Sequence, residues 1–204
     1  MSTKIICVIL AGGKGSRLDN KGKYLAILNE LPLWQHVYDK VKYQFDKTVI
    51  NVKREEKKTL SKIKNVENIY DKFEEDIGPL AGIHSAISYA EKNHYSIVCT
   101  VPVDTPFLPS DLAQNLFSKM IKTESEVVAA MSKNRIHPTI ALWQVNLKQK
   151  LEKNIKNKVR KIDNFTKDLK VTYADWKVRG IDPFFNINSY EDLKLAKNML
   201  KKHI

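Results

Sequence analysis

The feature that most limits the possible folds is a short apolar run that ends in a glycine-rich, cationic loop. Residues 5–10 are all apolar, which is typical of a strand buried on both faces within a parallel sheet. The segment from Gly12 to Lys23 then contains four glycines and four lysine or arginine residues. Because exposed backbone amides and positive charges in one loop favour an anion, this stretch predicts an α/β sheet with a phosphate site.

Strand-like and helix-like segments alternate through the first two thirds of the chain. The expected strands after residues 5–10 are 48–52, 66–70 and 96–101, and the expected helices are 32–45, 54–64, 78–93 and one that begins after residues 110–111. This alternation predicts a three-layer α/β/α sandwich with a Rossmann-like, mainly parallel sheet. We find no repeat, linker or low-complexity segment, so we expect residues 1–204 to form a single domain.

The last third of the chain is less regular. Two apolar runs, 127–131 and 139–143, predict strands that are joined either as a hairpin or by a crossover. The remaining expected elements are a helix at 147–165, short strands at 171–173 and 184–188, and a final helix at 190–200. Ser189 and Asp192 have the spacing of a capping box at the start of that last helix.

Composition and charge place the chain among soluble globular proteins. The net charge of +12 is compatible with an anionic partner, but solvated lysine-rich faces account for it more simply. Cys7 and Cys99 lie in apolar runs and are expected to be buried thiols, without a disulfide framework or metal-ligand spacing. With no signal-peptide pattern and no apolar run near the ~18 residues that span a bilayer, we expect a cytoplasmic protein without membrane association.

Polar or small residues follow four of the predicted strands at the point where each strand ends. They are Leu10, Ala11, Gly12, Gly13, Asn51, Asp71 and Asp104. Because ligands of parallel α/β sheets bind at the carboxyl ends of the strands, we expect these residues to meet. Taken singly, Asn51, Asp71 and Asp104 are also ordinary turn residues. Opposite a cationic phosphate loop, however, the Asp104 carboxylate fits a ligand of Mg²⁺, which binds one or two carboxylates together with phosphate oxygens.

The glycine loop matches neither the P-loop spacing nor the GxGxxG pattern of dinucleotide-binding folds. Other short blocks accompany it in the chain: 10–23, 32–37, 78–82, 102–106, 137–142 and 186–188. In this order, and over nearly the whole chain, they resemble the molybdenum cofactor guanylyltransferase family. The resemblance implies a nucleotidyltransferase fold of the nucleotide-diphospho-sugar transferase type.

The resemblance also implies roles for individual residues on the nucleotide side. Leu10, Ala11 and Gly12 match the loop that holds GTP, where Gly13 would also let backbone amides approach. The family's loop lysine and nearby arginine correspond to Lys23 and Arg17, the two cations expected at the phosphates. Asn51 and Asp71 match further GTP contacts, and Asp104 matches the residue shared by the nucleotide and Mg²⁺. Gly22 stands where the family usually has an acid, so the choice between Lys21 and Lys23 as the loop lysine stays open.

On the acceptor side, the resemblance places Asn186 and Asn188, with Pro138 and Arg160, where the family meets molybdopterin. The implied reaction transfers GMP from GTP to the terminal phosphate of molybdopterin, depends on Mg²⁺ and releases pyrophosphate. Implied partners are these two substrates, other molybdenum cofactor biosynthesis proteins and acceptor molybdoenzymes, with no nucleic acid and no membrane. His137 precedes Pro138 in a predicted loop, and its use is open.

Three kinds of alternative remain. A molybdopterin cytidylyltransferase, or a sugar or isoprenoid nucleotidyltransferase, would share this scaffold, because the choice of base depends on a few contacts that the sequence does not place in space. A basic nucleic-acid-binding protein is suggested by the charge but disfavoured by the scattering of the cations. An inactive carrier of the cofactor is disfavoured by the presence of both Lys23 and Asp104.

Overall fold

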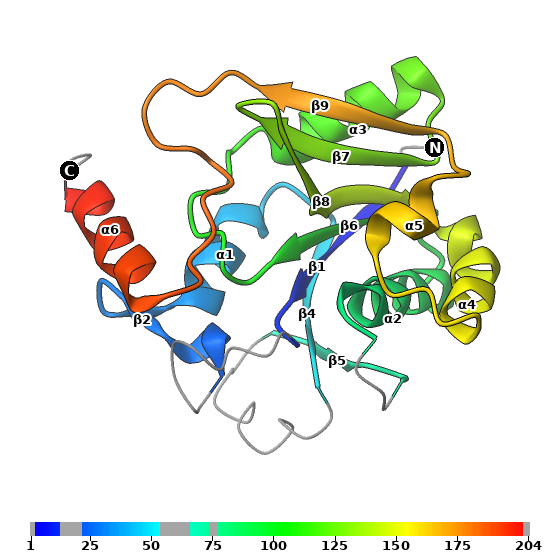
Figure 1. The fold of residues 1–204 in the computed structure, drawn as a ribbon, viewed down its shortest axis with the longest axis horizontal. Coiled ribbons are helices and arrows are strands. Elements are labelled where there is room, and N and C mark those ends of the chain that lie inside the picture. Colours follow the sequence, from blue (N-terminus) through cyan, green and yellow to red (C-terminus); the bar gives the residue numbers. More distant parts are fainter. Residues whose placement is uncertain (1–2, 13–21, 54–65, 74–76, 202–204) are drawn as a thin grey trace.

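The structure is a computed structural model that describes residues 3–12, 22–53, 66–73 and 77–201 (Figure 1). Its centre is a seven-stranded sheet in the order β5-β4-β1-β6-β8-β7-β9. The strands are β1 (Ile5–Leu10), β4 (Lys47–Val52), β5 (Asn68–Tyr70), β6 (Ile97–Pro102), β7 (Val127–Ser132), β8 (Arg135–Gln144) and β9 (Val171–Trp176). Only β8 among them runs antiparallel to its neighbours, so the sheet is mainly parallel, as predicted.

Helices cover both faces of this sheet. They are α1 (Leu33–Val41), α2 (Pro79–Lys92), α3 (Leu112–Thr123), α4 (Lys148–Lys156), α5 (Ile162–Thr166) and α6 (Tyr190–Lys201), with short 3₁₀ turns η1 (Lys23–Leu25) and η4 (Val145–Leu147). The three-layer α/β/α sandwich expected from the alternating pattern is therefore observed.

Within the part of the chain that the structure describes, no helix has the length and apolar character needed to cross a bilayer.

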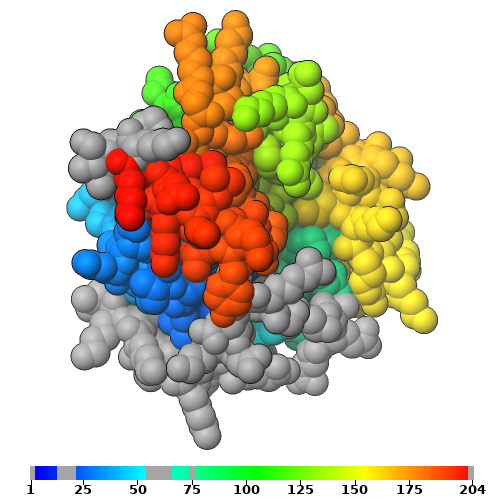
Figure 2. All heavy atoms as spheres, turned by 60° about the vertical axis from the view of Figure 1, so that its left-hand side comes forward, coloured from blue at the N-terminus to red at the C-terminus, as the bar shows by residue number. Residues whose placement is uncertain are grey.

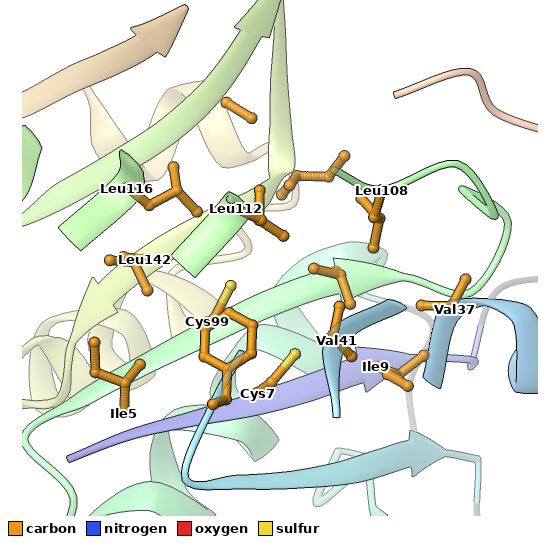
Figure 3. Close-up of a cluster of buried hydrophobic side chains, with 14 of the residues drawn as sticks. Ile5, Cys7, Ile9, Val37, Val41, Cys99, Leu108, Leu112, Leu116 and Leu142 are labelled. Carbon is orange, nitrogen blue, oxygen red and sulfur yellow. The ribbon is translucent and has the colours of Figure 1, made fainter. Parts of the chain in front are cut away.

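Strand β1 is buried on both faces because its alternate side chains enter two different cores. Ile5, Cys7 and Ile9 pack with side chains of α1 and α3, as Figure 3 shows. Ile6 and Val8 pack on the opposite face with side chains of α2, α4 and α5. Each fully buried aliphatic side chain of this kind contributes about 1.5–3 kcal/mol to stability, so β1 is firmly fixed between the two helix layers.

A smaller third core attaches the C-terminal helix to the N-terminal part of the chain. It joins Ala26, Leu28 and Leu33 to Ile187 and to side chains of α6. Leu28 belongs to a two-stranded ribbon formed by β2 (Ile27–Leu28) and β3 (Leu31–Pro32). In Figure 2 the red helix α6 lies directly against the blue segment that carries this ribbon. The C-terminal helix is thus held against the segment 26–33.

The run 127–143 forms a hairpin, which settles the alternative left open by the sequence. β7 and β8 pair with a register shift after Ala129, so that Ala130 is opposite His137 while Ala129 is opposite Ala141. Near this bulge, the main-chain carbonyl of Thr139 accepts a hydrogen bond from the Thr100 hydroxyl at 3.0 Å. Trp143 Nε1 donates to the same hydroxyl at 2.9 Å.

Two predictions for the last third of the chain are wrong. Residues 147–165 do not form one helix: α4 ends at Lys156, Lys158 adopts a left-handed backbone with φ 60°, and α5 begins at Ile162. Residues 184–188 do not form a strand either, because their backbone bonds elsewhere. The Phe184 N–H donates to the Asp182 carboxyl at 3.0 Å, and the Ile187 N–H donates to the Asp104 carbonyl at 2.9 Å. The helix expected at 54–64 lies outside the described residues.

Candidate functional site

The ends of β5, β4, β1 and β6 lie along one edge of the sheet, where the sequence predicts a ligand site. Leu10 is in register with Asn51 on one side and with Pro102 on the other. The chain stays paired just beyond the strands, since Ala11 N–H donates to the Asn51 carbonyl at 2.8 Å and Val103 N–H to the Leu10 carbonyl at 3.1 Å. Asp71 and Asp104 therefore enter the same edge from the two outer strands of this group.

One group of polar side chains at this edge, here called the Asp104 cluster, consists of Lys23, Asp104, Asn186 and Asn188. The Lys23 ammonium forms an ion pair with Asp104 Oδ2 and lies 2.6 Å from Asn188 Oδ1 and 3.4 Å from Asn186 Oδ1. The side chains of Lys23 and Asp104 are only 12% and 13% exposed. A cation that is surrounded by three oxygens in a shielded place is held in one position rather than left to sample solvent.

Backbone features fix both sides of the Asp104 cluster. Lys23 opens η1 directly after Gly22, whose φ of 95° is in the region that glycine favours; a Cβ there would lie 2.6 Å from a carbon of the Tyr24 ring. On the other side, the Asp192 carboxyl accepts the N–H groups of Asn188 and Ser189 at 2.8 and 2.9 Å, and Ser189 Oγ accepts the Asp192 N–H at 3.1 Å. The predicted capping box is thus present and fixes Asn188 at the start of α6.

The Asp104 carboxyl has an electrostatic environment suited to a cation. Burial raises its pKa above the ordinary range, and the neighbouring Lys23 ammonium opposes that rise. Among the described residues, Asp104 Oδ1 is buried and has no hydrogen-bond partner. An orphaned carboxylate oxygen beside two amide oxygens fits Mg²⁺, which prefers oxygen ligands. The described residues hold no group of three or more His, Cys, Asp or Glu able to bind a metal by themselves, so phosphate or water oxygens would complete the shell.

A second group, here called the Asp71 cluster, consists of Asn51, Asp71 and Ser85. Asp71 Oδ1 accepts hydrogen bonds from Asn51 Nδ2 at 3.0 Å and from the Ser85 hydroxyl at 3.2 Å. Burial raises the pKa of Asp71, and these two hydrogen bonds oppose the rise. Its other oxygen, Oδ2, faces Gly12, where a Cβ would lie 3.3 Å away. This second oxygen is therefore placed to accept a hydrogen bond from a ligand that approaches the backbone of the loop.

Comparisons with known proteins identify the family of this chain. The model of the MobA-like NTP transferase domain family matches residues 7–170. A protein of Brucella ovis named molybdenum cofactor guanylyltransferase is 32% identical over 210 residues, covering 96% of this chain and 92% of its own length. The chain belongs to the molybdenum cofactor guanylyltransferase family. This membership places it among the nucleotidyltransferases.

Solved structures extend the same result to the fold. Molybdopterin-guanine dinucleotide biosynthesis protein A from Archaeoglobus fulgidus superposes with a TM-score of 0.78 at 27% identity, covering 97% of this chain and 99% of its own. The 4-diphosphocytidyl-2C-methyl-D-erythritol synthase of Anaerococcus prevotii gives a TM-score of 0.75 at 16% identity, with 98% and 99% covered. The second likeness concerns the fold alone. This chain thus has the same three-layer fold as that synthase.

Most of the site residues expected from the family pattern fall into the two clusters. Leu10, Ala11 and Gly12 adjoin the Asp71 cluster, and Lys23, Asn186 and Asn188 form the Asp104 cluster. Gly13 and Arg17 lie outside the described residues, as does Lys21. The structure therefore shows Lys23 at the carboxylate, and the role of Lys21 stays a prediction.

Pro138 and Arg160 occupy other places than the Asp104 cluster. Pro138 lines a cavity of about 490 Å³ between α5 and strands β7, β8 and β9, and the lining of this cavity includes no member of the Asp104 cluster. The Arg160 guanidinium donates to the carbonyls of Ile155 and Val159, both at 3.2 Å. The Arg160 carbonyl also approaches Gly78 at the start of α2, where a Cβ would lie 3.6 Å away.

Two residues that position the Asp71 cluster were not expected from the family pattern or from periodicity. Ser85 lies in α2, and its single hydroxyl proton is shared between Asp71 Oδ1 at 3.2 Å and the Ala81 carbonyl at 3.0 Å. Gly82 lies one turn earlier, and a Cβ there would meet Asn51 Oδ1 and Leu10 Cδ2, each at 3.0 Å. The small residues at 78–82 are the signal for such a close approach, but they do not say which partner approaches.

Proposed function

We propose that this chain transfers GMP from GTP to the terminal phosphate of molybdopterin, giving molybdopterin guanine dinucleotide and pyrophosphate in a Mg²⁺-dependent reaction. The observation that carries the proposal is the Asp104 cluster: a shielded Lys23 ammonium on a carboxylate, at the strand-end edge of a chain in the guanylyltransferase family. Such a pair offers both a fixed positive charge for phosphates and an unused carboxylate oxygen for a metal.

The chemistry needs little from the protein except position and charge. An oxygen of the acceptor phosphate forms a bond to the α-phosphorus of GTP, and the bond from that phosphorus to the bridging oxygen of pyrophosphate breaks. The attacking group is already an anion at neutral pH, so no general base is required. Lys23 then offsets the negative charge that gathers on the phosphates, and Asn186 and Asn188 hold its ammonium in place.

The metal would be held at Asp104. When bound, Mg²⁺ supplies positive charge that neutralises the phosphate oxygens. Asp104 Oδ1 is the oxygen that would bind it, because Oδ2 already accepts from Lys23. The Asp104 side chain would thus serve two cations, one with each of its oxygens.

The Asp71 cluster would bind the nucleoside part of GTP. Asn51 and Ser85 fix Asp71 Oδ1, leaving Oδ2 to accept from an N–H or O–H group of the nucleotide. Leu10, Ala11 and Gly12 would bring the loop backbone alongside, with Gly13 and Arg17 continuing toward the phosphates. We further propose that residues 1–204 act as one domain, that Asn186 and Asn188, with Pro138 and Arg160, contact the acceptor, and that cofactor biosynthesis proteins and acceptor molybdoenzymes are partners.

The test is incubation of the purified protein with each nucleoside triphosphate in turn, Mg²⁺ and molybdopterin, scoring pyrophosphate release and the dinucleotide formed. We expect product with GTP and a loss of activity when EDTA removes the metal. Product with CTP alone would overturn the choice of base and leave a cytidylyltransferase. Salt-sensitive binding to random DNA without any nucleotide transfer would overturn the enzymatic proposal altogether.

A further inference from the structure

Three polar side chains meet at the end of the β7–β8 hairpin, outside both clusters. The Ser132 hydroxyl lies 2.9 Å from His137 Nε2, and 2.9 and 3.1 Å from the two oxygens of the Asp182 carboxyl. Ser132 is fully buried, with no exposed surface. The hydroxyl of Ser132 lies between a histidine and a carboxyl, so the direction of each hydrogen bond can be assigned. These directions distinguish a catalytic serine from a structural one.

The proton count excludes a hydrolytic triad. A serine has one hydroxyl proton, and an ionised carboxylate only accepts, so Ser132 donates to Asp182. His137 Nε2 must then carry a proton and donate to Ser132 Oγ. In a hydrolytic triad the serine donates to the histidine and the carboxylate orients the histidine, whereas here the carboxylate contacts the serine. With no exposed surface either, Ser132 is an anchor and not a nucleophile.

Asp182 begins the segment that carries the two asparagines of the Asp104 cluster. This segment, residues 182–188, is here called the strap. At its first end, Asp182 accepts from Ser132 and from the Phe184 N–H. The buried Phe184 ring lies 4.9 Å from the His137 ring and 5.1 Å, edge to face, from the Trp176 ring. At its other end, the Ile187 N–H donates to the Asp104 carbonyl.

The strap is not a strand or a helix, so no ladder of backbone hydrogen bonds fixes it. Its position depends on contacts at each end. At the first end these are the Ser132–Asp182 pair, the hydrogen bond from the Phe184 N–H to Asp182 and the packing of the buried Phe184 ring. A displacement there would move Asn186 and Asn188 away from Lys23, because only a few residues separate them from Asp182. Hydrogen bonds to a charged group are worth more than neutral ones, and Ser132 supplies such a bond to Asp182 from a strand outside the strap.

We infer that Ser132 and Asp182 are positioning residues, which anchor the strap and so align Asn186 and Asn188 on Lys23. They act through the asparagines and do not touch substrate. The catalytic consequence rests on the proposed function, whereas the anchoring of the strap does not. Since nothing in this anchor contacts the Asp71 cluster, its loss should affect use of the acceptor and leave the binding of GTP unchanged.

The test compares Ser132→Ala, Asp182→Ala and Asp182→Asn with the wild-type enzyme and with Asp175→Ala, an exposed residue of β9. We expect both anchor-removing alanine variants to exchange the Ile187 amide hydrogen roughly tenfold faster in NMR experiments without substrate. Asp182→Asn keeps one acceptor oxygen and should lie between Asp182→Ala and wild type. The Cys99 amide in the centre of the sheet should keep its protection in every variant, as should Ile187 in Asp175→Ala.

Steady-state kinetics give the second measurement. We expect kcat/KM for molybdopterin to fall roughly tenfold in the two alanine variants while KM for GTP stays within about twofold of wild type. An unchanged Ile187 exchange rate, or equal losses toward GTP and acceptor, would overturn the anchor. If all amides exchanged faster together, the residues would have a general structural role and the inference would also fail. Faster Ile187 exchange in a protein that transfers no GMP would leave the anchor standing and remove the proposed function.

Discussion

The Asp104 cluster and the Asp71 cluster are built on the same principle but have different chemistry. Each surrounds a carboxyl group at a strand end, and burial raises the pKa of both carboxyls. Asp104 is paired with the Lys23 cation, and its second oxygen has no partner among the described residues. Asp71 is held instead by two neutral donors, Asn51 and Ser85. The first arrangement suits reacting phosphates and a metal, and the second suits recognition of neutral donor groups.

The two clusters also differ in how far their members lie apart in the chain. Asp71 is 20 residues from Asn51 and 14 from Ser85, so the cluster forms within consecutive strand and helix units. Lys23 is 81 residues from Asp104, 163 from Asn186 and 165 from Asn188. The Asp104 cluster therefore forms only when distant parts of the chain have packed together, whereas the Asp71 cluster depends on segments that are close in the sequence.

The largest effect is expected for Asp104→Ala, which removes the carboxylate that pairs with Lys23 and that we propose to bind Mg²⁺. We predict a fall in turnover of at least about 10³-fold with an unchanged circular dichroism spectrum, because the loss is of charge stabilisation and not of core packing. Pyrophosphate release at saturating Mg²⁺ and GTP measures it. Near-normal turnover in the folded variant would show that Asp104 is not the metal-binding residue.

Lys23→Ala should have the next largest effect, with a fall in kcat of roughly 10²-fold. Its ammonium is the cation that the structure places on Asp104. Lys21→Ala is the matched control, and it should stay within a few-fold of wild type. The reverse result would assign the phosphate contact to Lys21 and remove the contrast between the clusters.

Asp71→Asn should change binding more than chemistry, raising KM for GTP about tenfold with a smaller change in kcat. It should also alter stability with pH. Because the folded-state pKa of Asp71 is raised, the folded protein holds this proton more tightly than the unfolded chain, and the contribution of Asp71 to stability falls as pH rises from below 3.8 through the folded pKa. The asparagine variant lacks this fall.

Urea unfolding at pH 4 and pH 7 measures the stability part of this prediction. The variant should gain stability relative to wild type between the two pH values, since the cost of the buried charge is present only at the higher one. A constant difference between the two proteins across this range would mean that the Asp71 carboxyl is not disfavoured as a charged group.

The smallest effect is expected for Gly82→Ala. Alanine favours the helix by about 1 kcal/mol, but the added Cβ would press on Asn51 and Leu10, and overpacking typically costs 1–3 kcal/mol. We predict a KM for GTP that rises by a few-fold with little net change in stability. Gly180→Ala is the control: φ is 98° there with no atom near the Cβ, so it should lose stability without changing KM.

The parts of the fold that could be predicted are those fixed by local patterns. The apolar run of β1 showed that it is buried on both faces, and small or polar residues at four strand ends indicated the edge where the site lies. Ser189 and Asp192 showed a capping box at the right place because the motif depends only on spacing. Each of these signals involves only a few neighbouring residues, so it can be recognised without knowledge of the fold.

The parts that could not be predicted depend on partners that are distant in the chain. The run 184–188 has the composition of a strand, but its amides bond to Asp182 and to the carbonyl of Asp104. Ser85 is an ordinary polar helix residue until Asp71 is brought beside it. In the stretch 147–165, the helix breaks at Lys158, which adopts a left-handed backbone. No glycine in this stretch indicates such a break in the sequence. In each case tertiary contacts overrode the local preference.

The long separation within the Asp104 cluster has a consequence for synthesis on the ribosome. Lys23 emerges 165 residues before Asn188, and at about 5–20 residues per second the interval between them is roughly 10 to 30 seconds. All three members of the Asp71 cluster, and Asp104 as the partner of Lys23, are synthesised within that interval. The order of translation therefore separates the two clusters in time. The Asp71 cluster can assemble early, whereas the Asp104 cluster is completed only after Asn186 and Asn188 have left the ribosome.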